Sequence, residues 1–268
     1  LKRMNTKYID LYYGFHQCSD PAFLTDDLKR WAQDAKKRGL IRFFGFTTHQ
    51  NMAKVLSAAS KLDWIDAVMT VYNFRLMQDP KMQAAIDACH KAGIGVVAMK
   101  VHGMGQRIDT KADKKLVSHF LEKGLTQGQA KIMLVLQDKR ICSACVGMKN
   151  VKLLDENVKA VRGKKKLTAD DGRVLKEYAG ETCHFYCAGC TDICGAAIPE
   201  APYVSDVMRY LMYYNSYGER AEARRLFGQI PVEVRDRLLS ADYRAAEARC
   251  PHHLPIRELV AEAAVKLA

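Results

Sequence analysis

Residues 8–47 read YIDLYYGFHQCSDPAFLTDDLKRWAQDAKKRGLIRFFGFT, and this stretch predicts a strand, a helix and a second strand. Nearly continuous apolar runs place the strands at Tyr8–Tyr13 and Phe43–Thr47. Between them the apolar residues recur at helical spacing, the basic residues gather late, and Gly39 stands where the helix would end. The stretch is therefore a βα repeat.

The same alternation continues to about residue 161. Further strands are predicted at Ala67–Tyr72, Gly95–Met99 and Ile141–Val146, with helices over 126–137 and 151–161. Apolar strands separated by helices imply an α/β fold with a parallel sheet whose outer face is covered by helices. The strands predicted here are too few to close an eight-stranded barrel by themselves.

The sequence predicts three parts: a βα region over 1–161, a basic linker over 162–167 and a helical unit over 168–268. In the last part the composition shifts to Cys, Tyr, Ala and Arg, and no strand pattern returns. The linker carries the densest positive run, RGKKK, in a chain of net charge +12. It lacks the interleaved aromatic residues on which single-stranded nucleic acid stacks, so we predict a solvated linker and no nucleic-acid partner.

The chain is 49% hydrophobic, which suits one large core and a smaller appendage. No apolar run reaches the length of about eighteen residues that a membrane span needs, so we predict no membrane partner. The start, LKRMNTKYID, lacks the order of a signal peptide, and we expect a cytoplasmic protein. It also lacks an initial methionine and reads as the middle of a helix, so we expect an absent upstream segment; an export signal there would change the compartment.

Nine cysteines occur in the chain, and an odd number with five in the last third argues for thiolate ligands rather than disulfides. Residues 183–194 read CHFYCAGCTDIC, a C-x3-C-x2-C-x3-C spacing. Such short gaps let successive thiolates converge on one iron–sulfur cube, and Gly189 permits a tight turn between them. A four-cysteine zinc site is the alternative, although structural zinc usually takes two well-separated pairs.

Two cysteines, Cys194 and Cys250, are candidates for the fourth ligand of such a cluster. The string RCPHHLPI at 249–256 resembles the end of a bacterial ferredoxin motif, in which the last cysteine of each run binds the other cluster. The positions that would hold the rest of a second cluster carry Ala246, Tyr243 and Ser240. We therefore predict one 4Fe-4S cluster; its predicted ligands are Cys183, Cys187, Cys190 and Cys250. In the alternative, Cys194 is the fourth ligand and Cys250 is a buried thiol.

Five strings in order carry a family resemblance: LKRMNTKYIDLYYGFH, GLIRFFGFTTH, IDAVMTVYNF, AGIGVVAMKVHGMG and GMKNVKLLDEN. With the cysteine run, they resemble the second half of the aldo-keto reductases, in particular the bacterial branch with a C-terminal ferredoxin-like domain. The resemblance implies strands four to eight of a (β/α)8 TIM barrel, followed by a small, mostly helical ferredoxin-like iron–sulfur domain. It places the family's catalytic Asp, Tyr and Lys on strands that this chain lacks.

The resemblance also implies roles for residues at the strand ends. His16 matches the catalytic His at the end of strand four, one position late, and a bulge at Gly14 would restore its direction; the alternative is a solvent-facing loop His. Thr47 and Thr48 match the pair that binds the nicotinamide amide, whereas Met69 and Met99 depart from the usual residues there. The remaining NADP(H) contacts implied are Lys100 and Gly103 at the pyrophosphate, Lys149 at the 2′-phosphate, and Glu156 and Asn157 at the adenine. Gly147 begins the string that resembles the family's adenosine-binding strand and helix.

The function implied for the intact protein is hydride transfer from NADPH to a small carbonyl substrate by an iron–sulfur oxidoreductase of the aldo-keto reductase type. The alternative is an iron–sulfur electron-transfer or binding module on a catalytically inactive half-barrel. A cluster passes single electrons, so an electron-transfer partner is a further expectation. A half-barrel also exposes a sheet edge, from which self-association is expected if the half-barrel is the whole chain.

Overall fold

The computed structural model describes residues 1–103 and 110–268. The chain divides into two compact units: one comprises 1–101 and 129–167, the other 102–128 and 168–268. This division differs from the predicted one, because 102–128 joins the C-terminal unit. No helix in the described ranges is both long and apolar enough to cross a membrane.

The first unit alternates strands and helices, as the sequence predicts. Its strands are β1 (Ile9–Phe15), β2 (Ile41–Thr48), β3 (Ala67–Val71), β4 (Gly95–Met99) and β5 (Ile141–Cys145). Its helices are α1 (Asp26–Lys37), α2 (Met52–Ala59), α3 (Pro80–Lys91), α5 (Gln127–Gln137) and α6 (Val151–Arg162), with short 3-10 turns at Lys2–Met4, Pro21–Phe23 and Leu76–Gln78.

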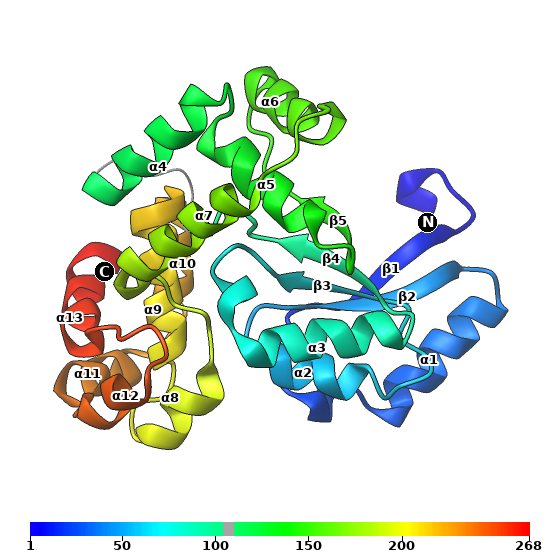
Figure 1. Cartoon of the computed structure of the whole chain (residues 1–268). Helices are drawn as coiled ribbons and strands as arrows, with labels where there is room; N and C mark the ends of the chain where they lie inside the picture. Colours follow the sequence, from blue (N-terminus) through cyan, green and yellow to red (C-terminus); the bar gives the residue numbers. More distant parts are fainter. Residues whose placement is uncertain (104–109) are drawn as a thin grey trace. The chain divides into compact units, whose positions relative to one another are not determined.

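All neighbouring strands are parallel, and their order in the sheet, β1-β2-β3-β4-β5, is their order in the chain. A doubly wound sheet reverses its strand order at a switch point, whereas a barrel wall adds each strand beside the last. Helices α1, α2 and α3 lie along one face of this sheet (Figure 1). The first unit is therefore an α/β fold consistent with part of a (β/α) barrel.

The two sheet faces differ in burial. Phe44, Phe46, Val68 and Val96 are fully buried, and the Phe44 ring lies 5.9 Å from that of Trp31 on α1, so this face meets the helices. The opposite face includes Met69, Val97 and Ser143, which are paired in register and half-buried or exposed. In a closed barrel the second face would line the interior.

Burial raises the pKa of Tyr13 on β1, and Cys145 and Cys142 on β5 raise it further.

Side-chain caps explain where the helices of the first unit begin. Thr25 accepts the Leu28 N–H at the start of α1, where Asp26 and Asp27 complement the helix dipole. At the other end Gly39 has φ +68°, a conformation that favours glycine. The predicted helix is confirmed, with its ends set by these residues.

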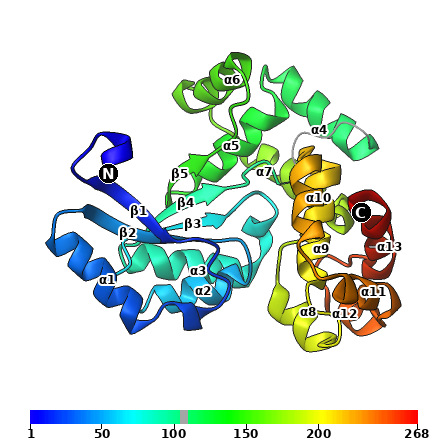
Figure 2. The same cartoon turned by 180° about the vertical axis from the view of Figure 1, so that it is seen from behind.

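The C-terminal unit is helical. Its elements are α4 (Lys111–Glu122), α7 (Ala169–Glu181), α8 (Thr191–Ala197), α9 (Val204–Met212), α10 (Arg220–Gly228), α11 (Val232–Ser240), α12 (Arg244–Arg249) and α13 (Ile256–Leu267), with a 3-10 turn at Cys183–Phe185 and a π-helical turn at Tyr213–Tyr217. Helix α9 packs against α10 and α13, and Val207, Leu211, Phe227 and Val260 belong to their shared core (Figure 2).

Buried polar contacts join α4 to α7. The Tyr178 hydroxyl donates to Asp113 Oδ1 (2.6 Å), and His119 Nε2 lies 2.8 Å from Asp171 Oδ1, which also accepts from Lys123. These contacts explain why 102–128 belongs with the C-terminal unit. A sequence pattern within α4 alone gives no sign of such distant partners.

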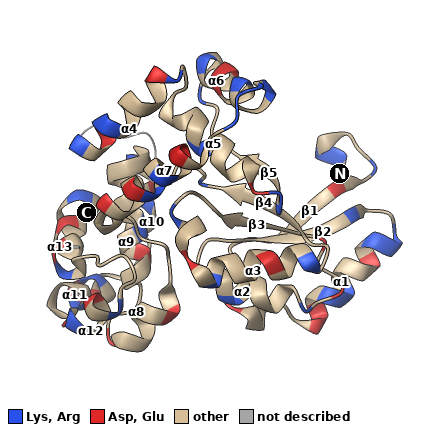
Figure 3. Cartoon of the chain, viewed as in Figure 1, with Lys and Arg blue, Asp and Glu red and all other residues tan. Residues whose placement is uncertain are grey.

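Charged residues occur on the helices of both units. In Figure 3, Lys and Arg are spread over the helices of both units and alternate with Asp and Glu. Arg162 ends α6, and Lys164, Lys165 and Lys166 follow the helix and are exposed. The role of 162–167 as a linker stays a prediction.

The Asp171→Asn variant is expected to lower the free energy of unfolding by about 1–3 kcal/mol at neutral pH, because the Asp171 side chain is 3% exposed and bonded to Lys123 and His119. Burial raises the Asp171 pKa, but hydrogen bonds from Lys123, Thr168 and His119 outweigh it, so the pKa lies well below its ordinary value. The carboxylate's contribution is therefore complete above a pH of about 4 and is lost as the pH falls through the folded-state pKa.

Urea unfolding of wild type and variant at neutral pH, and at successively lower pH, measures this contribution. The control is Asp170→Asn, since Asp170 is exposed beside Arg173 and its loss should leave the unfolding midpoint near that of wild type. An equal effect of the two substitutions would contradict the assigned role of Asp171.

Candidate functional site

The residues that the resemblance implies for the nucleotide lie at one edge of the sheet. Parallel strands bring all their carboxyl ends to the same edge. There His16 follows β1, Thr47 and Thr48 end β2, Lys100 follows β4, and Gly147 comes shortly after β5. The sheet thus gathers residues that are far apart in the sequence.

Thr47 and Thr48 point in different directions. Thr47 is paired with Met69 and lies on the open face, where its hydroxyl accepts the N–H of Gln17 (2.9 Å). Thr48 is fully buried, and its hydroxyl donates to Gln50 O (3.0 Å). Of the pair, Thr47 is the one whose hydroxyl proton remains for a ligand on the open face.

His16 stands just beyond a strand irregularity. The β1–β2 register shifts between Tyr13 and Phe15, which places a bulge at Gly14, where the sequence required one. A Cβ on Gly14 would collide with the Phe44 ring, so only glycine fits there. His16 itself is exposed, and its ring centroid lies 6.4 Å from that of His49.

The loop after β4 has the backbone freedom that a phosphate-binding loop needs. Lys100 has φ +55° and Gly103 φ +46°, and the Lys100 carbonyl accepts from Asn73 Nδ2 (3.2 Å). Gly103 belongs to the C-terminal unit, and the continuation of the loop lies outside the described residues. Only Lys100 of this pair can be placed at the strand ends.

The turn into α6 holds the residues predicted for the adenosine half of the nucleotide. Gly147 and Lys149 are exposed, and Asn150 caps α6 by accepting the Leu153 N–H (2.9 Å). Asn157 is buried, and its amide donates to the Gly147 carbonyl (3.4 Å). Asn157 therefore positions the Gly147 turn, and its contact with adenine stays a prediction.

Glu156, the neighbouring residue on α6, is half-buried. Its backbone carbonyl accepts from the Gln129 amide of α5 (3.0 Å). This bond fixes the backbone of α6 and leaves the Glu156 carboxylate for a ligand. Its predicted contact with adenine also remains a prediction.

The cysteines of the C-terminal unit fall into two groups. Cys187, Cys194 and Cys250 are buried and belong to one hydrophobic core, with Cys190 half-buried beside them. Cys183 lies in the 3-10 turn Cys183–Phe185 and is half-buried, as Cys190 is. Burial therefore does not set Cys183 apart from Cys190, and the role of each as a ligand stays a prediction.

Electrostatics identifies which thiols are neighbours. Burial raises the pKa of Cys187 to about 11 and of Cys194 to about 12, and Cys250 raises both further. Burial also raises the Cys190 pKa, with further contributions from Cys187, Cys194 and Cys250. The thiols of Cys187, Cys190, Cys194 and Cys250 therefore lie close enough to interact.

No three His, Cys, Asp or Glu side chains within 1–103 and 110–268 converge as the ligands of a single metal ion do. In an iron–sulfur cube each iron takes one thiolate, so the four ligands stand apart by the width of the cube. Burial raises the pKa of Cys187, Cys190 and Cys194, so these thiols are protonated unless a bound metal group displaces their protons.

Comparison with known proteins identifies the family. The Aldo/keto reductase family model matches residues 1–178. The chain belongs to this family. The match ends before the cysteine run and covers all five strands of the sheet. No curated protein matches the chain.

Solved aldo-keto reductase structures share the fold of this family member. A thermostable enzyme, Tm1743, in complex with the inhibitor epalrestat, is 22% identical with a TM-score of 0.51, over 66% of this chain and 62% of its own. The apo form of AKR11C1 from Bacillus halodurans is 20% identical with a TM-score of 0.52, over 66% and 64% respectively. This chain therefore spans less than two thirds of the length of these structures.

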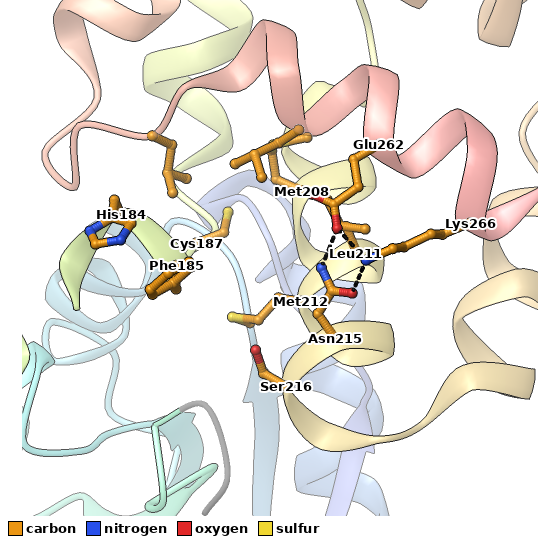
Figure 4. Close-up of a pocket in the computed structure, with 12 residues that line it drawn as sticks. His184, Phe185, Cys187, Met208, Leu211, Met212, Asn215, Ser216, Glu262 and Lys266 are labelled. Carbon is orange, nitrogen blue, oxygen red and sulfur yellow. Dashed lines mark hydrogen bonds and ion pairs between the residues drawn. The ribbon is translucent and has the colours of Figure 1, made fainter. Parts of the chain in front are cut away.

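A cavity of about 300 Å³ in the C-terminal unit of this aldo-keto reductase has Cys187 in its lining (Figure 4). At one end, Asn215 Nδ2 donates to Glu262 Oε1 (2.8 Å), and Lys266 Nζ donates to Glu262 (2.6 Å) and to Asn215 Oδ1 (3.0 Å). The apolar part of the lining includes Met208, Leu211 and Met212. The cavity therefore combines an apolar wall next to Cys187 with a polar cluster formed by Asn215, Glu262 and Lys266.

Sequence reasoning missed two residues of these sites. Asn73, which supports Lys100, lies within the string that carries the family resemblance, so a signal for it existed. Arg209 is 5% exposed on α9, and its charge lowers the pKa of Cys187 against the effect of burial. Nothing in its local sequence distinguishes Arg209 from the exposed arginines nearby.

Proposed function

We propose that this chain is the C-terminal part of an NADP-dependent oxidoreductase that transfers hydride to a small carbonyl substrate. The observation that carries the proposal is the family match over a sheet whose strand ends gather the predicted nucleotide residues. Bound NADPH would supply the hydride. The proton donor and its partners belong to strands that the chain does not contain.

The chain's own residues would bind and orient the nucleotide. Thr47 offers its hydroxyl proton on the open face, beside Met69, which can cover a ring without bonding to it. Lys100 and the exposed Lys149 offer positive charge to phosphate groups. His16 would act at the substrate oxygen, from the position that the Gly14 bulge gives it.

The Lys149→Glu variant is expected to weaken NADPH binding about tenfold or more and to leave NADH binding nearly unchanged, because only NADPH carries a 2′-phosphate. Fluorescence titration of the full chain with each nucleotide measures both affinities. The matched control is Lys159→Glu, which makes the same charge change at an exposed position at the far end of α6. Equal losses for both nucleotides would contradict the assigned contact.

We also propose that the C-terminal unit holds a 4Fe-4S cluster. Cys187, Cys194 and Cys250 are buried in one hydrophobic core, and Cys190 lies between the first two in the chain. This arrangement supports a ligand set of Cys187, Cys190, Cys194 and Cys250, in which Cys194 replaces the predicted Cys183. Both candidates for the fourth ligand would then bind. When present, the cluster supplies one-electron chemistry, and the protein supplies its thiolates and a largely buried site.

Replacing single cysteines by serine tests this ligand set. The wild-type chain, reconstituted anaerobically with iron and sulfide, should bind about four irons. Each ligand variant should lose most of this iron, whereas Cys183→Ser should retain it, as should the control Cys89→Ser in the buried core beneath the sheet. Iron lost in Cys183→Ser and kept in Cys194→Ser would instead support the set predicted from the sequence. Zinc bound in place of iron would refute the cluster.

A second function is favoured by the residues at the nicotinamide position. The Thr48 hydroxyl donates its hydrogen bond to the Gln50 carbonyl, so its proton is not available to a nicotinamide amide. Met69, which cannot donate a hydrogen bond to that amide, lies at the second position. These features suit an iron–sulfur electron-transfer module without carbonyl chemistry. Single-electron reduction of a soluble acceptor such as cytochrome c, in the absence of any nucleotide binding, would favour this second function.

A further inference from the structure

Arg209 is a buried cation in the core of the C-terminal unit. Its side chain lies on α9, is 5% exposed, and donates from Nη2 to the Tyr213 hydroxyl (2.8 Å). The guanidinium also lies 5.6 Å from the centroid of the Tyr213 ring. No Asp or Glu of residues 1–103 or 110–268 forms an ion pair with it, whereas exposed arginines of the same unit, such as Arg225 and Arg244, do have such partners.

Burial of an unpaired charge is costly. Moving a guanidinium out of water costs several kcal/mol of hydration free energy. A hydrogen bond to a phenol and a contact with its ring compensate only part of this cost. A fold that keeps such a group in its core needs an anion nearby. The buried groups around Arg209 must therefore include the site of that anion.

The groups that act on Arg209 include the Cys187 thiol, together with Tyr213 and Tyr186, and Asp206 of α9 also acts on Cys187. Ser205 lies one helical turn before Arg209 on α9, and the Cys187 thiol donates to its carbonyl at 3.9 Å. The Arg209 charge acts on Cys187, and Cys187 acts on Arg209 in return. Protonated thiols carry no charge and cannot compensate the guanidinium.

A bound cluster would change this balance. Four thiolates around an iron–sulfur core carry a net negative charge, which becomes one unit more negative when the core takes up an electron. Of the two oxidation states, the reduced one gains more from a fixed positive charge nearby. Arg209 would thus compensate the cluster in both states and favour the reduced state.

We propose that Arg209 is the built-in counter-charge of the cysteine site, which raises the reduction potential of the bound cluster and holds the ligand shell together. This inference rests on the cluster proposed above. It assigns Arg209 a positioning and tuning role rather than a ligand role. Tyr213 is the residue that orients the guanidinium.

The reduction potential is the decisive measurement. In a redox titration of the reconstituted full chain, followed by visible absorbance and electron paramagnetic resonance, Arg209→Gln should lower the ratio of reduced to oxidised cluster about tenfold at a fixed potential, equivalent to about 59 mV. Arg209→Lys should recover much of this loss, because it keeps the charge. The matched control is Arg237→Gln, an exposed arginine of α11 that should leave the ratio unchanged.

Thermal stability provides a second readout that needs no redox activity. In the cluster-free chain, Arg209→Met should raise the unfolding midpoint, because the uncompensated charge is gone. In the reconstituted chain the same variant should lower the midpoint, because the cluster then lacks its counter-charge. Opposite signs support the inference, and a decrease in both forms would show that Arg209 is only a packing residue.

The outcomes separate this inference from the proposal beneath it. A wild-type chain that binds no iron refutes the cluster itself. A wild-type chain that binds iron, with a potential unchanged in Arg209→Gln, leaves the cluster intact and refutes the role of Arg209. An equal shift of the reduction potential in Arg237→Gln would show that only the net charge of the protein matters, which would also refute the role of Arg209.

Discussion

Parallel hydrogen bonding between each strand and the next one in the chain determines the arrangement of the first unit. Because β1 to β5 follow one another without a reversal, every loop that leaves a strand emerges at the same edge. That edge brings Thr47, Lys100 and the Gly147 turn together across more than half of the unit's length. Register then decides which side chains share a face: Thr47 aligns with Met69 and with Val97 on the open side.

The Gly14 bulge shows how one residue adjusts this pattern. Side chains alternate along a strand, so a regular β1 would turn His16 away from the position that the family pattern implies. An extra residue restores the alternation, and the close approach of the Phe44 ring leaves room there only for glycine. The placement of His16 therefore depends on the packing of a phenylalanine one strand away.

In the C-terminal unit, burial determines which charge states are favourable. Helices α8 and α9 and the segment after α12 bring thiols and one guanidinium into an apolar core. In such surroundings the neutral form of a thiol is favoured, and burial of an isolated cation is costly. Protonated thiols therefore leave the positive charge of Arg209 uncompensated. The proposed iron–sulfur cluster would supply negative charge there, and a cavity of about 300 Å³ has Cys187 in its lining.

The sequence by itself determined the strands, the parallel sheet and the helical character of the C-terminal unit, because apolar periodicity, caps and short cysteine gaps are local properties. It also carried the family resemblance that the family model confirmed for residues 1–178. Only the tertiary structure decided which thiols are neighbours, that Thr47 rather than Thr48 faces the open side, that 102–128 belongs with α7, and that Arg209 lies beside Cys187. Each of these depends on contacts between residues distant in the sequence, and no local pattern encodes such contacts.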